Sequence, residues 1–196
     1  MGPQAPGNTP LDPDEAADLI PGHVTTQAEL NQVEQANILE ASTWAWGRRH
    51  KDILSDEFIR ELHLRMFKDV WKWAGTYRTS LKNLGIAPEQ IPVAIRKLCD
   101  DADYWVENKT YPWDELAARS HHRLVAIHPF PNGNGRHSRL MTDILLNAHG
   151  QKPFSWGSAT NLDTMGPKGT ARERYLAALR AADGQDFKPL LDFVRT

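Results

Sequence analysis

The chain has 196 residues, of which 40% are hydrophobic and 24% charged, a composition that suits one globular domain with or without arms. Its formal net charge is -2 and it has no long basic run, so we expect no nucleic-acid binding. No apolar run approaches the roughly 20 residues that span a bilayer, so no membrane segment is expected. A polar, proline-rich start predicts no secretory signal, and the single cysteine, Cys99, is typical of a cytoplasmic protein.

Prolines and hydrophobic periodicity divide the first half of the chain. Residues 1–22 predict a flexible arm, because prolines recur through a polar stretch. Apolar residues at helical spacing predict an N-terminal helix within residues 23–49. Ser55, followed by two acidic residues, predicts the start of a second helix, which Gly75 ends. The turn-forming residues between 76 and 87 predict one small hairpin.

The second half of the chain predicts further helices and no repeats. Pro92 and Pro112 each stand where a first helical turn begins, and a helix starts again near Asn134. A last helix is expected over residues 171–182, before a short C-terminal segment. The prediction is therefore a mainly helical fold, with residues 23–196 as a single domain.

The segment from His128 to Arg139 combines a base with an anion site. The imidazole of His128 titrates near neutral pH, which suits a general base. Gly133 and Gly135 let a ligand approach the backbone, and the turn leads into a helix N-terminus, whose N–H groups attract anions. Arg136 and Arg139 share one face of that helix, so the segment predicts a polyphosphate site beside a base, the arrangement for phosphoryl or nucleotidyl transfer. The alternative is a helix–turn–helix corner whose glycines only make the turn.

These residues resemble the core motif of the Fic family. The sequence HPFPNGNGRHSR (128–139) is similar to His-Pro-Phe-x-Asp/Glu-Gly-Asn-Gly-Arg-x-x-Arg, and WKWAGTYR (71–78) resembles the segment before the family's flap. The resemblance extends from about Leu30 to Val194 and is strongest to small bacterial members known as mobile mystery protein B. It implies a Fic-type helical bundle with a small β-hairpin flap. It also implies the usual activity of the family, transfer of AMP from ATP to a Ser, Thr or Tyr hydroxyl of a target protein.

The resemblance assigns roles to individual residues. His128 would be the general base and Arg136 the second catalytic residue, holding the β-phosphate, while Arg139 would hold the γ-phosphate. The donor would be ATP, with Mg²⁺, or Mn²⁺ in its place, as the metal. The nucleotide-binding residues would be Gly133, Asn134, Gly135, Arg136 and Arg139. The stretch from Thr79 to Ala87 would be the flap, which holds the target chain as an added strand. Its target-binding residues would be Thr79, Ser80, Leu81, Lys82, Asn83, Leu84 and Gly85.

One motif position departs from the family. Where members have Asp or Glu to bind Mg²⁺, this chain has Asn132, whose amide oxygen is neutral. The lost charge weakens metal binding and the neutralisation of the leaving pyrophosphate. Three functions therefore stay open: an adenylyltransferase, a nucleotide-binding module that barely transfers, and a transferase of another group such as UMP or phosphate.

The resemblance also predicts self-inhibition by the N-terminal helix. Many members carry a helix with the pattern Ser/Thr-x-x-x-Glu-Gly/Asn, whose Glu pairs with the second motif arginine and blocks the γ-phosphate pocket. Glu34 is the candidate here, although Leu30 and Gln35 stand at the flanking pattern positions. Glu29, four residues after Thr25, offers a second fit. The alternative is that both acids simply face solvent on the helix.

Overall fold

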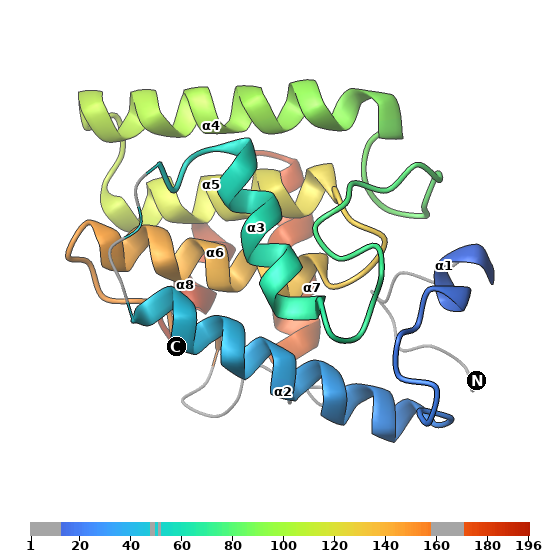
Figure 1. The fold of residues 1–196 in the computed structure, drawn as a ribbon. Coiled ribbons are helices and arrows are strands. Elements are labelled where there is room, and N and C mark those ends of the chain that lie inside the picture. The colour runs from blue at the N-terminus through green and yellow to red at the C-terminus, as the bar shows by residue number, and fades with distance from the viewer. Residues whose placement is uncertain (1–12, 48–49, 51, 158–170) are drawn as a thin grey trace.

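The computed structural model describes residues 13–47, 50, 52–157 and 171–196. Over these ranges the chain is helical, and its β-structure is limited to one isolated bridge (Figure 1). In chain order the elements are α1 (Pro13–Ala17), α2 (Gln27–Trp46), α3 (Asp56–Phe67), the short 3-10 helix η1 (Pro88–Gln90), α4 (Ile91–Asn108), α5 (Trp113–Ile127), α6 (Asn134–Ala148), α7 (Ala171–Asp183) and α8 (Lys188–Val194). None of the described helices is long and apolar enough to cross a membrane.

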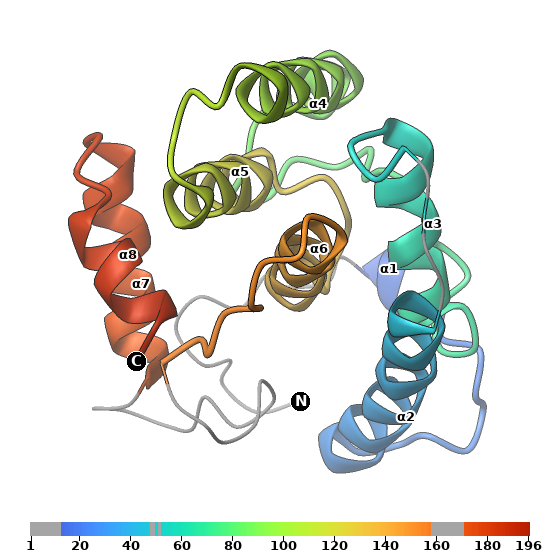
Figure 2. The ribbon, with the colours of Figure 1, turned by 90° about the vertical axis from the view of Figure 1, so that its left-hand side faces the viewer.

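Helices α5 and α6 form the centre of the bundle. Seen end-on, they lie between α2 and α3 on one side and α7 and α8 on the other, while α4 covers the outer side of α5 (Figure 2). The core correspondingly has two clusters of buried side chains. The larger includes Leu62 and Phe130, and the smaller includes Leu146 and Leu190. Because residues of α6 belong to both clusters, this helix is packed on both sides.

Helix α2 lies within the range predicted for the N-terminal helix, and α3 begins at the predicted residue, Ser55. Thr26 caps α2, with its hydroxyl accepting a hydrogen bond from the Glu29 N–H at 3.2 Å, while the Glu29 carboxylate accepts one from the Thr26 N–H at 2.9 Å. The Ser55 hydroxyl caps α3 by accepting a hydrogen bond from the Phe58 N–H at 3.1 Å. Both caps satisfy N–H groups that a helix leaves without partners.

The second helix ends earlier than predicted. We expected it to reach Gly75, but α3 ends at Phe67. The Phe67 carbonyl accepts hydrogen bonds from the N–H groups of both Val70 and Trp71, at 3.0 and 2.9 Å, so the chain leaves the helix in tight turns. These turns place the Trp71 and Trp73 rings in a stack with centroids 5.0 Å apart.

The hairpin predicted between residues 76 and 87 is not formed. The stretch is described throughout and contains no strand. Instead, the buried Arg78 guanidinium gathers carbonyl groups from its own stretch and from the end of α5: it donates to Ser80 at 2.8 Å and His128 at 2.7 Å, and also to Ile86. The Arg78 N–H donates to the Pro129 carbonyl at 2.9 Å. One arginine side chain thus organises the stretch in place of a strand ladder.

The N-terminal arm differs from the prediction over its described part. Residues 1–12 of the arm expected at 1–22 lie outside the described residues, but the residues after them contact the domain. Leu19 forms an antiparallel bridge with Trp71, and the Ile20 N–H donates to the Val70 carbonyl at 2.9 Å. These backbone bonds hold the described arm against the turns after α3.

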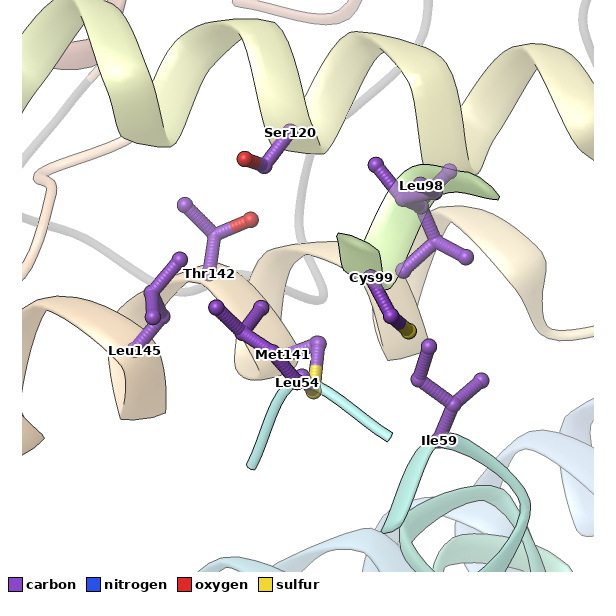
Figure 3. Close-up of a pocket in the computed structure, with 9 residues that line it drawn as sticks. Leu54, Ile59, Leu98, Cys99, Ser120, Met141, Thr142 and Leu145 are labelled. Atoms are coloured by element: carbon purple, nitrogen blue, oxygen red, sulfur yellow. The ribbon is translucent and has the colours of Figure 1, made fainter. Parts of the chain in front are cut away.

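A small cavity of about 20 Å³ lies where α3, α4, α5 and α6 meet (Figure 3). That is room for about one water molecule. Its lining is Leu54, Ile59, Leu98, Cys99, Ser120, Leu124, Met141, Thr142 and Leu145, which includes none of the predicted site residues. Burial raises the pKa of the Cys99 thiol to about 12, so this cysteine is a neutral packing residue.

Candidate active site

His128 ends α5 in the left-handed conformation, with φ 54, and so turns the chain into the motif loop. The residue is only 7% exposed. Burial, followed by the nearby positive charges of Arg78 and Lys82, lowers the pKa of His128 to about 4, although a hydrogen bond with the Val125 carbonyl acts in the opposite direction. The imidazole is therefore neutral at pH 7, which is the form that accepts a proton.

The loop after His128 is held by the buried side chain of Asn134. Its Oδ1 accepts from the Phe130 N–H at 2.9 Å and its Nδ2 donates to the Phe130 carbonyl at 2.8 Å. Gly133 has φ 78, the left-handed conformation that the sequence predicts for this turn. A Cβ there would lie 2.5 Å from the Phe67 ring, so this position has room for glycine only. The loop is thus rigid, and the side chain of Asn134 contributes to its shape.

The loop leads directly into the N-terminus of α6. The first N–H group bonded within the helix is that of His137, which donates to the Gly133 carbonyl at 2.9 Å. The N–H groups of residues 134–136 therefore have no acceptor inside the helix. Together with the helix dipole they favour a bound anion. The anion site that the sequence predicts would be built from the backbone of Asn134, Gly135 and Arg136.

His63 supports the loop from α3, a role that no local pattern in the sequence indicates. Its Nδ1 accepts from the Gly75 N–H at 3.0 Å, so the proton is on Nε2, which donates to the Asn132 carbonyl at 3.1 Å. The ring also stacks on Phe130, with centroids 3.7 Å apart. Burial, followed by the charge of His137, lowers the pKa of His63 well below its usual value. The neutral tautomer that both bonds need is therefore the stable one.

The donors of the loop do not by themselves fit a metal ion. Asn132 offers a neutral amide oxygen, which already accepts from the Gly133 N–H at 2.6 Å. Within the described ranges, no group of three His, Cys, Asp or Glu side chains could hold a metal. Asp143 accepts from the Phe154 N–H and from Trp156 Nε1, at 3.0 and 2.9 Å, so it has a structural role. The groups of this loop that can act on a bound nucleotide are therefore the imidazole, the arginine and the backbone N–H groups.

Glu34 pairs with the first motif arginine. Its Oε2 accepts from Arg136 Nη1 at 2.7 Å, and its Oε1 accepts from Trp71 Nε1 at 2.8 Å. The Glu34 side chain is 7% exposed and that of Arg136 is 27% exposed. The resemblance had implied a pair with the second motif arginine, Arg139. A carboxylate from α2 thus pairs with Arg136, the arginine that is predicted to bind the β-phosphate.

Arg139 points toward a different partner, and Glu29 lies apart from both arginines. Arg139 is buried, with its guanidinium 5.8 Å from the centre of the Tyr175 ring on α7. Glu29 forms the cap of α2 with Thr25 and Thr26, and its hydrogen bonds with both lower its pKa to about 2. Capping accounts for Glu29, which leaves Glu34 as the acid that reaches the motif.

The flap stretch lies against the motif loop without forming a strand. Gly85 has φ 95, and a Cβ there would lie 2.6 Å from the His128 Cβ, so this glycine allows the flap to approach the imidazole. Leu81 and Leu84 are 75% and 43% exposed, while Thr79 and Asn83 are also exposed. Ser80 and Lys82 turn the other way, toward Glu15 of α1. Glu15 was not singled out from the sequence, because nothing local marks a glutamate in a five-residue helix.

A sequence model of the Fic/DOC family matches residues 53–146, which include α3, the flap stretch and the whole motif loop. Among curated proteins, the protein adenylyltransferase fic-1 of Caenorhabditis briggsae is 29% identical over 155 residues, covering 76% of this chain and 28% of that protein. The protein adenylyltransferase Fic of Drosophila virilis is 37% identical over 141 residues, covering 69% of this chain and 27% of that protein. The chain thus spans little more than a quarter of the length of these relatives.

Solved structures share the fold. Fic-1 of Caenorhabditis elegans, residues 134–508, superposes with a TM-score of 0.65 at 24% identity, covering 92% of this chain and 51% of that one. The BepC protein of Bartonella tribocorum, solved with bound AMPPNP, has a TM-score of 0.70 at 16% identity, covering 93% of this chain and 96% of that one. Both alignments extend well beyond the helices that surround the loop. With its motif loop, its helical bundle and these relatives, the chain belongs to the Fic/DOC family.

Proposed function

We propose that this protein transfers AMP from ATP to a Ser, Thr or Tyr hydroxyl of a target protein. One observation carries the proposal: a buried, neutral imidazole at His128 directly precedes a glycine turn and a helix N-terminus that favours anions. Relatives that carry the name protein adenylyltransferase support the choice of AMP as the transferred group.

In the proposed reaction, His128 takes the proton from the target hydroxyl. The hydroxyl oxygen then forms a bond with the α-phosphorus, while the bond from that phosphorus to the bridging oxygen of pyrophosphate breaks. The hydrogen bond with the Val125 carbonyl orients the ring. Bound phosphates would raise the pKa of His128 from about 4 toward the working pH, because negative charge favours the imidazolium. That change would make the base more effective.

The leaving pyrophosphate would be stabilised by the start of α6. Its N–H groups at residues 134–136 and the Arg136 guanidinium are held in place before any substrate arrives. The loop cannot relax easily, since Asn134 and His63 both bind its backbone. Arg139 is proposed to bind the γ-phosphate, as the resemblance implies.

The target segment is proposed to lie along the flap stretch. The exposed Leu81 and Leu84 side chains provide apolar contacts there, and the flap approaches His128 closely at Gly85. Contacts of this kind, together with target backbone hydrogen bonds, would need little sequence in common among targets.

The proposal also gives Glu34 an inhibitory role. A phosphate cannot bind Arg136 through the same N–H group that donates to the Glu34 carboxylate. Glu34 also accepts from Trp71, so it is held from two sides. We expect ATP to displace this paired, nearly buried carboxylate when its phosphate binds Arg136 through that nitrogen.

The test is transfer of label from each α-labelled nucleoside triphosphate to the protein itself and to a lysate, in Mg²⁺ and in Mn²⁺. We expect label from ATP in the wild type and none in His128→Ala. The matched control is His23→Ala, which removes an exposed histidine outside the motif. Label that survives in His128→Ala would refute the role of the base.

Two further results would change the proposed donor or activity. Transfer from another triphosphate, such as UTP, would replace AMP as the transferred group. Nucleotide binding without transfer in any variant would favour a binding module. The Asn132→Asp variant distinguishes both results from slow transfer caused by weak metal binding. A gain of transfer in that variant would show that the missing carboxylate limits the rate.

A further inference from the structure

Trp71 contacts the N-terminal arm with its backbone and Glu34 with its side chain. Its backbone forms the antiparallel bridge with Leu19, and its indole Nε1 donates to Glu34 Oε1 at 2.8 Å. The other oxygen of that carboxylate accepts from Arg136 Nη1 at 2.7 Å. One residue thus connects the arm to the ion pair at the motif.

The indole holds the carboxylate in a fixed direction. Trp71 is 2% exposed, and its ring stacks on that of Trp73 with centroids 5.0 Å apart and an angle of 18° between the two planes. A side chain packed in this way has little freedom to rotate. Because its N–H binds one oxygen of Glu34, the carboxylate is oriented so that the other oxygen meets Arg136.

The contact of α2 with the turns after α3 does not depend on the indole alone. Asn37 lies three residues after Glu34 on the same face of α2. Its Nδ2 donates to Asp69 Oδ2 at 2.6 Å, and its Oδ1 accepts from the Asp69 N–H at 3.1 Å. Loss of the indole N–H should therefore leave α2 in place and act on the Glu34 carboxylate.

The arm binds the two peptide groups that flank Trp71. The Ile20 N–H donates to the Val70 carbonyl, before Trp71, at 2.9 Å. The Asp18 carbonyl accepts from the Lys72 N–H, after Trp71, at 3.0 Å. These bonds fix the backbone from which the indole projects, so the position of the indole depends on the arm as well as on packing.

Any bond that holds Glu34 in place opposes a phosphate that competes for Arg136. A carboxylate that moves away from Arg136 disturbs its bond to the indole, and a buried N–H left without its acceptor is costly. The guanidinium itself has a further support, since its centre lies 5.1 Å from the centre of the Phe67 ring. The indole therefore adds to the cost of moving Glu34 without being needed to hold Arg136.

We propose that Trp71 is a positioning residue of the inhibitory contact: its indole holds Glu34 on Arg136, and the arm sets how firmly, because it binds the peptide groups on both sides of Trp71. This inference rests on the proposed function, because it takes Arg136 as the place where a phosphate of ATP binds. It makes residues 18–20 a regulatory element, whose removal from the turns after α3 should ease the entry of the nucleotide.

The test is ATP binding, measured by titration of a fluorescent ATP analogue and competition with unlabelled ATP. Trp71→Phe keeps an aromatic ring in the stack and removes the indole N–H. We expect its Kd for ATP to fall about tenfold, the value of one hydrogen bond to a charged group. The direction of the change is the decisive readout, because damage to the fold would raise the Kd instead.

Trp156→Phe is the matched control. It removes another buried indole N–H that binds a carboxylate, since Trp156 Nε1 donates to Asp143 Oδ2 at 2.9 Å. Its Kd for ATP should not fall. In a Glu34→Ala background, Trp71→Phe should change the Kd by less than about twofold, because the carboxylate that the indole holds is then absent.

Ile20→Pro tests the arm, and it also serves if Trp71→Phe does not fold. Proline has no N–H, so the bond to the Val70 carbonyl is lost while Trp71 is unchanged. We expect the Kd for ATP to fall about threefold, the value of a hydrogen bond between neutral groups. This effect should also disappear in the Glu34→Ala background.

Unchanged or weaker ATP binding by Trp71→Phe, together with tighter binding by Glu34→Ala, would overturn this inference and leave the inhibitory role of Glu34 standing. A gain that persists in the Glu34→Ala background would overturn it as well, since the indole would then act without the carboxylate. Unchanged binding by Ile20→Pro would overturn the part given to the arm. Tighter binding by Trp71→Phe without transfer of label by any variant would support this inference and refute the proposed transfer alone.

Discussion

Glu34→Gln should increase the affinity of the protein for ATP. The substitution keeps the size of the side chain and an amide oxygen that can accept from Trp71 Nε1, but it removes the charge that pairs with Arg136. A hydrogen bond between charged groups contributes roughly 1.5–3 kcal/mol. If ATP must break this contact to reach Arg136, its removal should lower the Kd by roughly tenfold to a hundredfold. Label transfer should rise with it at low ATP concentration.

The assay is titration of a fluorescent ATP analogue, followed by competition with unlabelled ATP. Glu40→Gln is the control, because it makes the same charge change on α2 at a side chain that is 66% exposed and 3.7 Å from Lys68. We expect a change within about twofold for that variant, as for a weak exposed pair. Equal Kd values for wild type and Glu34→Gln would refute the reasoning, since ATP would then bind without displacing the carboxylate.

The remaining predictions concern stability. Burial lowers the pKa to about 3 at His121 and to about 4 at His128 and His137. The unfolded chain has histidine pKa values near 6.5, so below that pH it binds more protons, and stability should fall as pH drops from 6.5 toward 4. Between pH 7.5 and pH 5, each of these histidines should lower the free energy of unfolding by roughly 2 kcal/mol. Asp143, whose pKa burial raises to about 6, should raise that free energy by roughly 1 kcal/mol over the same range. An unchanged urea midpoint between these pH values would contradict this expectation. Gly133→Ala should lower the free energy of unfolding by roughly 2 kcal/mol or more, because the new Cβ combines a positive φ with a clash against the Phe67 ring. Gly150→Ala, with positive φ and open space, should lose about 1 kcal/mol in the same urea assay, and equal losses would exclude the contact as a cause.

Features that depend on neighbouring residues could be predicted from the sequence. The cap at Ser55 and the turn at Gly133 each need only a few adjacent side chains, and the structure has both. The motif loop belongs to this class, since its proline, glycine and asparagine residues fix a local conformation. The candidate site was found because its base and its anion site lie next to each other in the chain.

Features that depend on distant residues could not be predicted. The flap stretch contains turn formers that suit a hairpin, but Arg78 binds carbonyls near residue 128 instead. The pairing of Glu34 with Arg136 joins residues 102 positions apart. The resemblance to the family predicts that Glu34 pairs with a motif arginine. Whether that arginine is Arg136 or Arg139 depends on how α2 crosses α6, which no local pattern indicates.

An acidic side chain of α2 holds one cation of the proposed site in this structure. Glu34 pairs with Arg136, where a phosphate is proposed to bind. The pair gives the nearly buried carboxylate a counter-charge before any substrate arrives, and a carboxylate left there without one would be strongly destabilising. A phosphate that binds Arg136 competes with Glu34 for the same cation, so we expect entry of the nucleotide to be coupled to the position of α2.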